Sequence, residues 1–132
     1  MAIYIGHMKP TTNSDDEKKL LELIQEKYPT FNLDKFESTG QIYFNDDEDI
    51  VIDFVNTVEE TFRNIWFNIF CIDEENEVAI TITYKDRKET VSQYDRIDTA
   101  SGKLRKLSET VEIVDDECIR LRQQEKEKSK EE

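Results

Sequence analysis

The fold is decided by two stretches, NIWFNIFCI at residues 64–72 and EVAITITY at residues 77–84. The polar turn DEEN separates them, so together they predict a β-hairpin. The second stretch alternates apolar residues with threonines and alanine, which is typical of a strand with one side in a core. The first stretch is apolar on both sides, with Phe67 on one and Trp66 on the other. We therefore expect a central strand that is covered on both faces, with both side chains in the core.

Further strands are predicted on both sides of this hairpin. Residues 2–5 and 41–44 each carry apolar side chains at alternate positions, and Pro10 is expected to end the first of these strands. After a second polar turn, a more polar strand through Val91 and Tyr94 is expected towards the edge of the sheet.

A first helix is predicted from the sequence that follows the N-terminal strand. Ser14 and Glu17 have the spacing of a capping box, so we expect the helix to start with Ser14 as its cap. Leu20 and Ile24 continue an apolar stripe along one side of the helix. Pro29 ends it, because proline has no amide hydrogen to donate to a further turn.

Residues 47–62 fit two different structures. The β-branched run at residues 50–55 is typical of a strand, but the apolar residues of the whole segment also trace one face of a helix. Asn45 followed by Glu48 resembles a weak capping pair, and it favours the helix.

The C-terminal part is predicted to add one strand at residues 110–114. Residues 119–121 either pair back on that strand or begin a helix, and residues 123–132 form a charged, solvated tail, either as an extension of a helix or as a disordered segment. The predicted fold class is α+β, with an antiparallel sheet of four to five strands and one or two helices packed on it. We expect a single domain at residues 1–122, because neither an internal repeat nor a linker divides the chain.

The negative charge of the chain is concentrated in one third of its length. Residues 34–77 hold thirteen acidic and two basic residues, a net charge of −11 out of −13 for the whole chain. A surface that is acidic only for solubility would spread this excess more evenly. Strong acidity also disfavours direct nucleic-acid binding, which needs lysine and arginine against the phosphates.

The residues needed for common kinds of catalysis and cofactor binding are scarce. His7 is the only histidine, so neither a catalytic triad nor a zinc site with the usual ligands is predicted. Cys71 and Cys118 are too few for a disulfide scaffold. The acidic run at residues 45–49 lacks the glycine and the final glutamate of a calcium loop, and the three glycines form no phosphate-binding motif. We therefore expect no enzyme activity, no metal and no cofactor.

The acidic third is the candidate interaction surface. We expect its two acidic clusters to lie at the ends of neighbouring elements and to face a basic partner together, with an exposed aromatic residue beside them. The predicted partner-binding residues are Asp46, Asp47, Glu48, Asp49, Asp53, Asp73, Glu74, Glu75, Glu77 and Tyr43.

These residues indicate a small acidic, non-catalytic binding protein. We expect it to occlude a basic enzyme such as a nuclease, in the manner of an inhibitor, an immunity protein or a mimic of nucleic-acid charge. The alternative is a structural or assembly subunit of a bacterial or phage complex, and a homo-oligomer is compatible with both. No stretch is long and apolar enough for a transmembrane helix and no signal peptide is recognisable, so we expect a cytoplasmic protein without a membrane partner.

Overall fold

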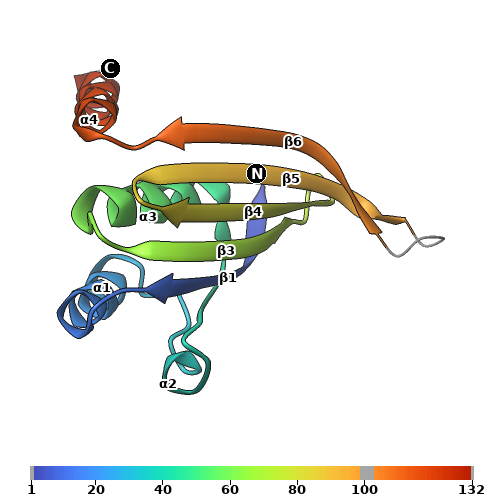
Figure 1. Ribbon diagram of the computed structural model, residues 1–132, viewed down its shortest axis with the longest axis horizontal. Coiled ribbons are helices and arrows are strands. Elements are labelled where there is room, and N and C mark those ends of the chain that lie inside the picture. Colours follow the sequence, from blue (N-terminus) through green and yellow to red (C-terminus); the bar gives the residue numbers. More distant parts are fainter. Residues whose placement is uncertain (1, 99–102, 132) are drawn as a thin grey trace.

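The chain folds around one antiparallel β-sheet. The computed structural model describes residues 2–98 and 103–131 (Figure 1). From the N-terminus, the elements are β1 (Ile3–Thr11), α1 (Ser14–Lys27), α2 (Phe36–Thr39), β2 (Ile42–Asp47), α3 (Glu48–Thr61), β3 (Trp66–Asp73), β4 (Val78–Lys85), β5 (Lys88–Asp98), β6 (Lys103–Ile113) and α4 (Asp116–Glu131). The strand order is β2-β1-β3-β4-β5-β6, and every neighbouring pair is antiparallel. The predicted α+β class is confirmed, although the described residues form six strands and four helices, slightly more than expected.

The predicted hairpin is confirmed as β3 and β4. Phe67 lies opposite Tyr84 and Cys71 lies opposite Ile80, so that one face of the hairpin is apolar between these two pairs. Both aromatic residues are almost fully buried, and their rings stack with centroids 5.2 Å apart. Alternate side chains of β3 are buried and exposed without interruption, as a strand with one core face requires.

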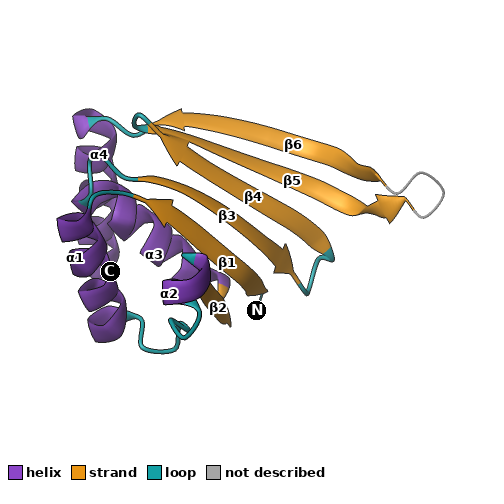
Figure 2. Cartoon of the chain, turned by 60° about the horizontal axis from the view of Figure 1, so that its bottom comes forward, coloured by secondary structure: helices purple, strands orange, loops and turns teal. Residues whose placement is uncertain are grey.

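The expectation that β3 is covered on both faces was wrong. Helices α1 and α3 pack on one face of the sheet and leave β3 open on the other (Figure 2). Trp66, Phe70 and Ile72 point to the open side and are 42%, 38% and 45% exposed. An apolar run on both sides of a strand therefore did not mean that both sides were buried.

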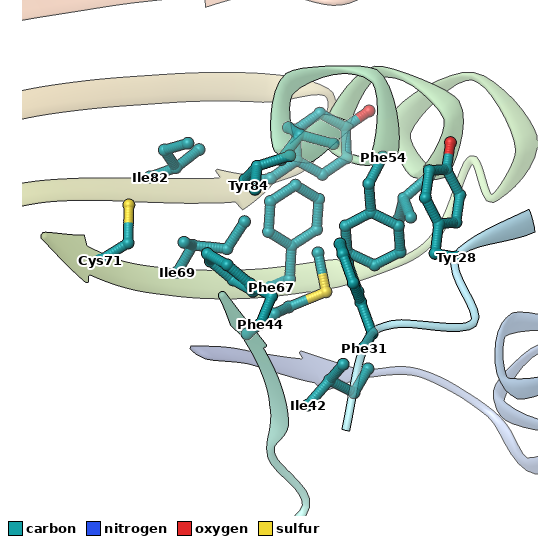
Figure 3. Packing of buried hydrophobic residues seen from close by; sticks show 14 of the residues in the cluster. Tyr28, Phe31, Ile42, Phe44, Phe54, Phe67, Ile69, Cys71, Ile82 and Tyr84 are labelled. Atoms are coloured by element: carbon teal, nitrogen blue, oxygen red, sulfur yellow. The ribbon is translucent and has the colours of Figure 1, made fainter. Parts of the chain in front are cut away.

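The core is formed between the covered face of the sheet and helices α1 and α3 (Figure 3). Phe54 of α3 packs edge-on against the rings of Tyr28 and Phe31, at 5.1 and 4.9 Å between centroids. Leu20 and Ile24 of α1 are fully buried, as their helical spacing predicted.

Both predicted helices are present, but their N-terminal caps differ from the expected ones. Asn13 caps α1, because its side chain accepts a hydrogen bond from the amide of Asp16, so Ser14 is already the first helical residue. The segment with two alternatives is the helix α3, and Asp47 occupies its cap position instead of Asn45. Residue 45 belongs to β2, which continues three residues beyond the strand expected at 41–44.

β1 passes through the position where proline was expected to end it. Pro10 still lies opposite Phe67 of β3, whereas the pairing with β2 stops at Met8. A proline lacks only the hydrogen bond of its own nitrogen, and a strand with one free side at that point tolerates this loss. β1 therefore pairs on both sides from Tyr4 to Met8 and with β3 alone from Lys9 to Thr11.

The C-terminal part of the chain is more regular than predicted. β5 is not an edge strand, because β6 pairs along it from Ile113 back to Lys103, a much longer strand than the one expected at 110–114. The edges of the described sheet are β2 and β6. The predicted solvated tail is helical and belongs to α4 as far as Glu131, while residue 132 lies outside the described residues.

Candidate functional site

The two acidic clusters meet at one end of the sheet. The first residues of β1 lie between them, since Tyr4 has Asp46 of β2 on one side and Asp73 of β3 on the other. Two backbone hydrogen bonds hold this end together, from the amide of Glu48 to the carbonyl of Ala2 at 2.9 Å and from Glu74 to Ile3 at 3.2 Å. We call residues 46–49 and 73–77 together the acidic end. Clusters that are far apart in the sequence thus form one surface.

Not all of the predicted acidic residues are available to a partner. Asp73 is buried, and its carboxylate accepts hydrogen bonds from the amides of Glu75 and Asn76 and from the Asn76 side chain. It therefore shapes the turn of the hairpin. Asp53 accepts a hydrogen bond of 2.6 Å from Tyr28, which joins α3 to the end of α1.

Two further acids at this end also have partners within the chain. Asp46 accepts a hydrogen bond of 2.5 Å from the Thr30 hydroxyl, and Glu48 accepts one of 3.2 Å from Tyr4. Burial, followed by the charge of Glu48, raises the pKa of Tyr4, so this phenol remains a donor at every physiological pH. Burial and the hydrogen bond to Asp53 raise the pKa of Tyr28 to about 12 in the same way.

The exposed part of the acidic end comes from two short segments. Asp49 lies in the first turn of α3, where the helix dipole favours negative charge, and it is exposed. Glu74, Glu75 and Glu77 are exposed on the turn between β3 and β4. These four side chains, together with the half-buried Asp47, give the surface its charge.

Aromatic residues lie on the open face of the sheet beside the acidic end. Tyr43 of β2, His7 of β1 and Phe70 of β3 form a row, with ring centroids 5.7 Å and 6.2 Å apart. They line a shallow, mostly apolar hollow of about 570 Å³ together with Ile5 and Asn45. The predicted partner-binding residue Tyr43 is half exposed, on the face of the sheet opposite to α1 and α3, and the ammonium group of Lys35 lies 5.7 Å from its ring centroid.

The opposite end of the open face carries lysine. Lys85 places its ammonium group 4.2 Å from the ring centroid of Trp66, a cation–π contact. Lys9 and Lys88 are exposed on neighbouring strands at this end. This arrangement was not predicted from the sequence, because Trp66 was expected in the core.

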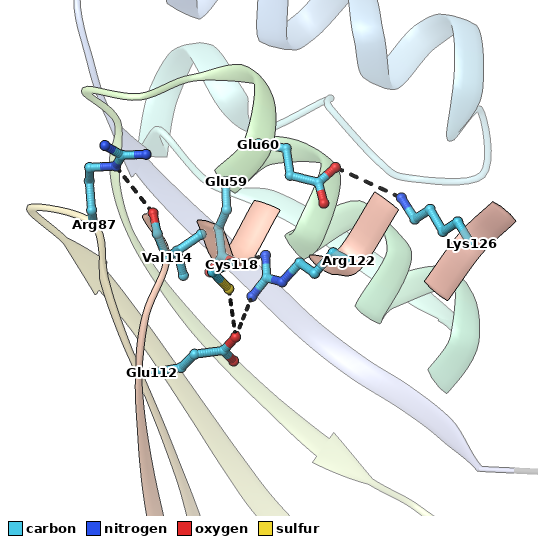
Figure 4. A network of polar contacts seen from close by, with 8 residues as sticks. All are labelled: Glu59, Glu60, Arg87, Glu112, Val114, Cys118, Arg122 and Lys126. Atoms are coloured by element: carbon cyan, nitrogen blue, oxygen red, sulfur yellow. Dashed lines mark hydrogen bonds and ion pairs between the residues drawn. The ribbon is translucent and has the colours of Figure 1, made fainter. Parts of the chain in front are cut away.

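A second polar cluster lies beneath α4 and was not predicted (Figure 4). Arg122 of α4 contacts Glu59 of α3 at 3.0 Å and Glu112 of β6 at 3.4 Å. The Cys118 thiol donates to Glu112 at 2.9 Å, and Lys126 lies 3.8 Å from Glu60. The cluster therefore joins the last helix to both layers of the protein.

Glu59 is the most perturbed carboxyl group of this cluster. Burial, then the hydrogen bond and charge of Glu89, raise its pKa to about 9, and Arg122 only partly opposes them. One of its oxygens has no hydrogen-bond donor as long as both carboxyls are charged. Burial and Glu89 therefore favour the protonated form of Glu59, and the hydrogen bond from Arg122 opposes this effect.

A raised carboxyl pKa is one of the features that an active site would need. The neighbouring hollow of about 600 Å³ is lined by Glu89, Glu112, Cys118 and Arg122 among others, but not by Glu59, which is 1% exposed. A molecule in the hollow would therefore not reach the perturbed group. The cluster fits a structural role in holding α4.

The cysteines are not activated nucleophiles. Burial raises the pKa of Cys71 to about 12, and burial together with Glu112 raises that of Cys118 to about 11. Both are free thiols. Within residues 2–98 and 103–131, no three histidine, cysteine or acidic side chains are grouped as metal ligands.

No family model, curated protein or solved structure matches this chain. None of the helices within the described ranges is both long enough and apolar enough to cross a bilayer. The interpretation of function therefore rests on the surfaces described above.

The sequence held a signal for only one of the two missed features. Glu59 lies four positions after Val55 and eight after Val51, so a charge falls within the apolar stripe of α3. That pattern indicates a buried carboxyl group. Its partner Arg122 is 63 positions away, and no local pattern connects the two.

Proposed function

We propose that this chain is a small, non-catalytic binding protein that occludes the basic surface of another protein through its acidic end. The proposal is carried by one observation: residues 46–49 and 73–77, which are separate in the sequence, lie together on either side of β1. A basic groove that normally accepts phosphate, such as that of a nuclease, has the complementary charge. Acidic residues of this kind speed association and fix orientation.

The charge distribution supports an interaction role over a general solubility role. Asp49 and Glu75 are exposed, and Asp47 is half-buried beside them. An inhibitor or immunity protein of a bacterium or phage, acting in the cytoplasm, has this combination of small size and localised acid. Binding would block the partner sterically and would need no cofactor.

The experiment compares two baits of equal net charge. One carries Asp49→Lys and Glu75→Lys at the acidic end, and the control carries Glu22→Lys and Glu26→Lys on the exposed side of α1. Each is used to capture proteins from a lysate of the source organism at low and high salt, next to the wild type. We expect the wild type and the α1 control to retain the same basic protein at low salt, and the acidic-end variant to lose it.

Captured proteins then need a kinetic test, because retention alone does not identify a target. With the purified partner, the association rate of the wild type should fall steeply as salt rises, while that of the acidic-end variant should be slow at every salt concentration. Equal association of the two double variants would remove the acidic end from the mechanism.

A further inference from the structure

The open face of the sheet is the most apolar exposed surface of the described chain. Nine large hydrophobic side chains are exposed, and five of them lie on this face: Trp66, Phe70, Ile72, Val111 and Ile113. His7 and Tyr43 add their rings at its other side. The apolar residues of β3 lie beside the rings of His7 and Tyr43, whereas Thr81, Thr83, Thr90 and Ser92 of β4 and β5 separate them from Val111 and Ile113. Scattered apolar residues need no explanation on a protein surface, but an apolar group on adjacent strands often marks an interface.

The charges on this face are sorted along the direction of the strands. Glu74, which follows β3, and Asp47 of β2 lie at one end, where Ile3 pairs with Asp47. Lys9 and Lys85 lie at the other end, beside Trp66. Lys88 joins them from β5.

Other described charges lie between these two ends. Lys106 lies 3.1 Å from Glu109, so that these two residues of β6 compensate each other, and the ammonium group of Lys35 lies 5.7 Å from the centroid of the Tyr43 ring. The strand ends of the face are thus acidic on one side and basic on the other, with apolar side chains of β1 to β3 and hydroxyl groups of β4 and β5 between them, whereas the chain as a whole carries −13.

We propose that a second copy of this chain covers the open face, in a symmetric dimer whose sheets pack against each other. The twofold axis lies in the plane of the interface and runs across the strands. This rotation reverses the strand direction, so the acidic end of each face lies over the lysine end of the other. Glu74 then lies over the Trp66 and Lys85 pair of the second copy, and the contact occurs twice.

The dimer explains how the exposed apolar side chains are covered and how two acidic chains can associate. Aligned packing of two twisted sheets is a common way to bury one face of each. Two chains of net charge −13 repel each other over most of their surface. On the open face, however, the lysines at one end outnumber the acidic residues that they meet at the other end of the second copy. The dimer also holds its two acidic ends at opposite ends of the sandwich, where their mutual repulsion is screened by salt.

Other occupants fit the charge pattern less well. A nucleic-acid strand would meet lysine at one end only, and Asp47 and Glu74 would repel its phosphates at the other. The dimer covers Glu74 and Asp47 of the acidic end and leaves Asp49 exposed on the helix side of the molecule, so a basic partner and the second copy would compete for part of the acidic end. The dimer itself needs no other partner, and its tests do not depend on the proposed function.

The first measurement is the mass of the full chain by sedimentation equilibrium over a wide range of concentration. We expect twice the mass of one chain at the upper concentrations. Ile72→Ser should shift the equilibrium to the monomer, whereas Ile52→Ser should not, because Ile52 is exposed to a similar extent but lies on α3. Far-UV circular dichroism of both variants confirms that the fold is unchanged.

The second measurement tests the orientation of the two copies. Lys85→Glu and Glu74→Lys should each weaken self-association, by about tenfold for the loss of favourable charge contacts. Mixing the two variants should restore the dimer, because one copy then presents acid at both ends and the other presents lysine at both ends. Trp66 is the only tryptophan, so its fluorescence reports contact at this end directly.

Three results would overturn the proposal. The wild type would remain a monomer at every concentration, or both single-charge variants would dimerise like the wild type, or their mixture would not associate. A monomer whose Trp66 fluorescence responds to oligothymidylate or to a purified basic partner would assign the face to that occupant instead.

Discussion

Arg122 of α4 reaches into the protein and lies 3.0 Å from Glu59 of α3, a side chain with no exposed surface. The other contacts of this helix are mostly at its first turn, where Asp116 pairs with Arg63 and Arg87, while Cys118 and Ile119 are only partly buried and Leu121 is 48% exposed. The attachment of α4 therefore depends on a buried carboxyl group whose pKa is raised to about 9. Its protonation and its arginine partner can be tested separately.

The free energy of unfolding should fall as the pH rises between about 5 and 9. In this range the folded chain holds a proton on Glu59 that the unfolded chain has already lost, because the folded pKa is about 9 and the ordinary value is 4.5. Unfolding then releases a proton, which higher pH favours. Glutamine can still donate a hydrogen bond but has no proton that titrates in this pH range. The Glu59→Gln variant should therefore match the wild type near pH 5 and be more stable near pH 9.

This difference is measured by urea unfolding of both proteins across the pH range. Glu22→Gln serves as control, since Glu22 is exposed on α1 and its replacement should leave the pH dependence unchanged. A Glu59→Gln variant with the same pH dependence as the wild type would mean that Glu59 is ionised in the folded protein.

Replacing Arg122 should release α4 from the body of the protein. Arg122→Leu removes the hydrogen-bond donor to Glu59 and the ion-pair partner of Glu112, and leaving a buried acceptor without its donor costs about 1 to 3 kcal/mol when nothing relaxes. Undocking of the helix relieves part of this cost, so the change should be seen as faster amide hydrogen exchange in residues 118–127. Arg120→Leu is the matched control, because Arg120 is 58% exposed in its ion pair with Glu117. Similar exchange in both variants would contradict the role of Arg122.

Phe67→Ala should be strongly destabilising. The side chain is 2% exposed and its ring stacks on Tyr84, so we expect a loss of about 3 to 5 kcal/mol in chemical unfolding. Phe70→Ala, three residues along the same strand and 38% exposed, should cost about 1 kcal/mol or less under conditions where the chain is monomeric. Equal losses would mean that both faces of β3 are covered in solution.

Local sequence patterns were sufficient to predict the secondary-structure elements, but not to predict which face of the sheet the helices cover. The alternation of Val78, Ile80, Ile82 and Tyr84 is set within one strand, and the turn after Cys71 is set by its polar residues, so the hairpin could be predicted. Whether the other side of β3 is covered depends on how many helices pack there. Both α1 and α3 use the same face, and no pattern near Trp66 contains that information.

The acidic end could be anticipated only in part for the same reason. The charge clusters were visible in the sequence, but their meeting requires the pairing of Tyr4 with both Asp46 and Asp73. The roles of single acids also depend on distant partners, as the hydrogen bonds from Thr30 to Asp46 and from Tyr28 to Asp53 show. Composition gives the charge of a surface, whereas tertiary contacts decide which carboxylates remain free to bind.

Gly6→Ala should destabilise the sheet more than Gly40→Ala, although each variant adds a single methyl group. A Cβ at Gly6 would lie 2.1 Å from the carbonyl oxygen of Phe70 and 2.5 Å from the Cα of Cys71, and these backbone atoms cannot move without separating β1 from β3. The cost should reach about 3 kcal/mol, the upper end for overpacking. At Gly40 the new Cβ meets only the end of Lys9 at 4.0 Å, but φ is +71°, so left-handed strain costs about 1 to 2 kcal/mol. Urea unfolding of the two variants measures both values, and a smaller loss at Gly6 than at Gly40 would show that the two central strands are not packed this closely.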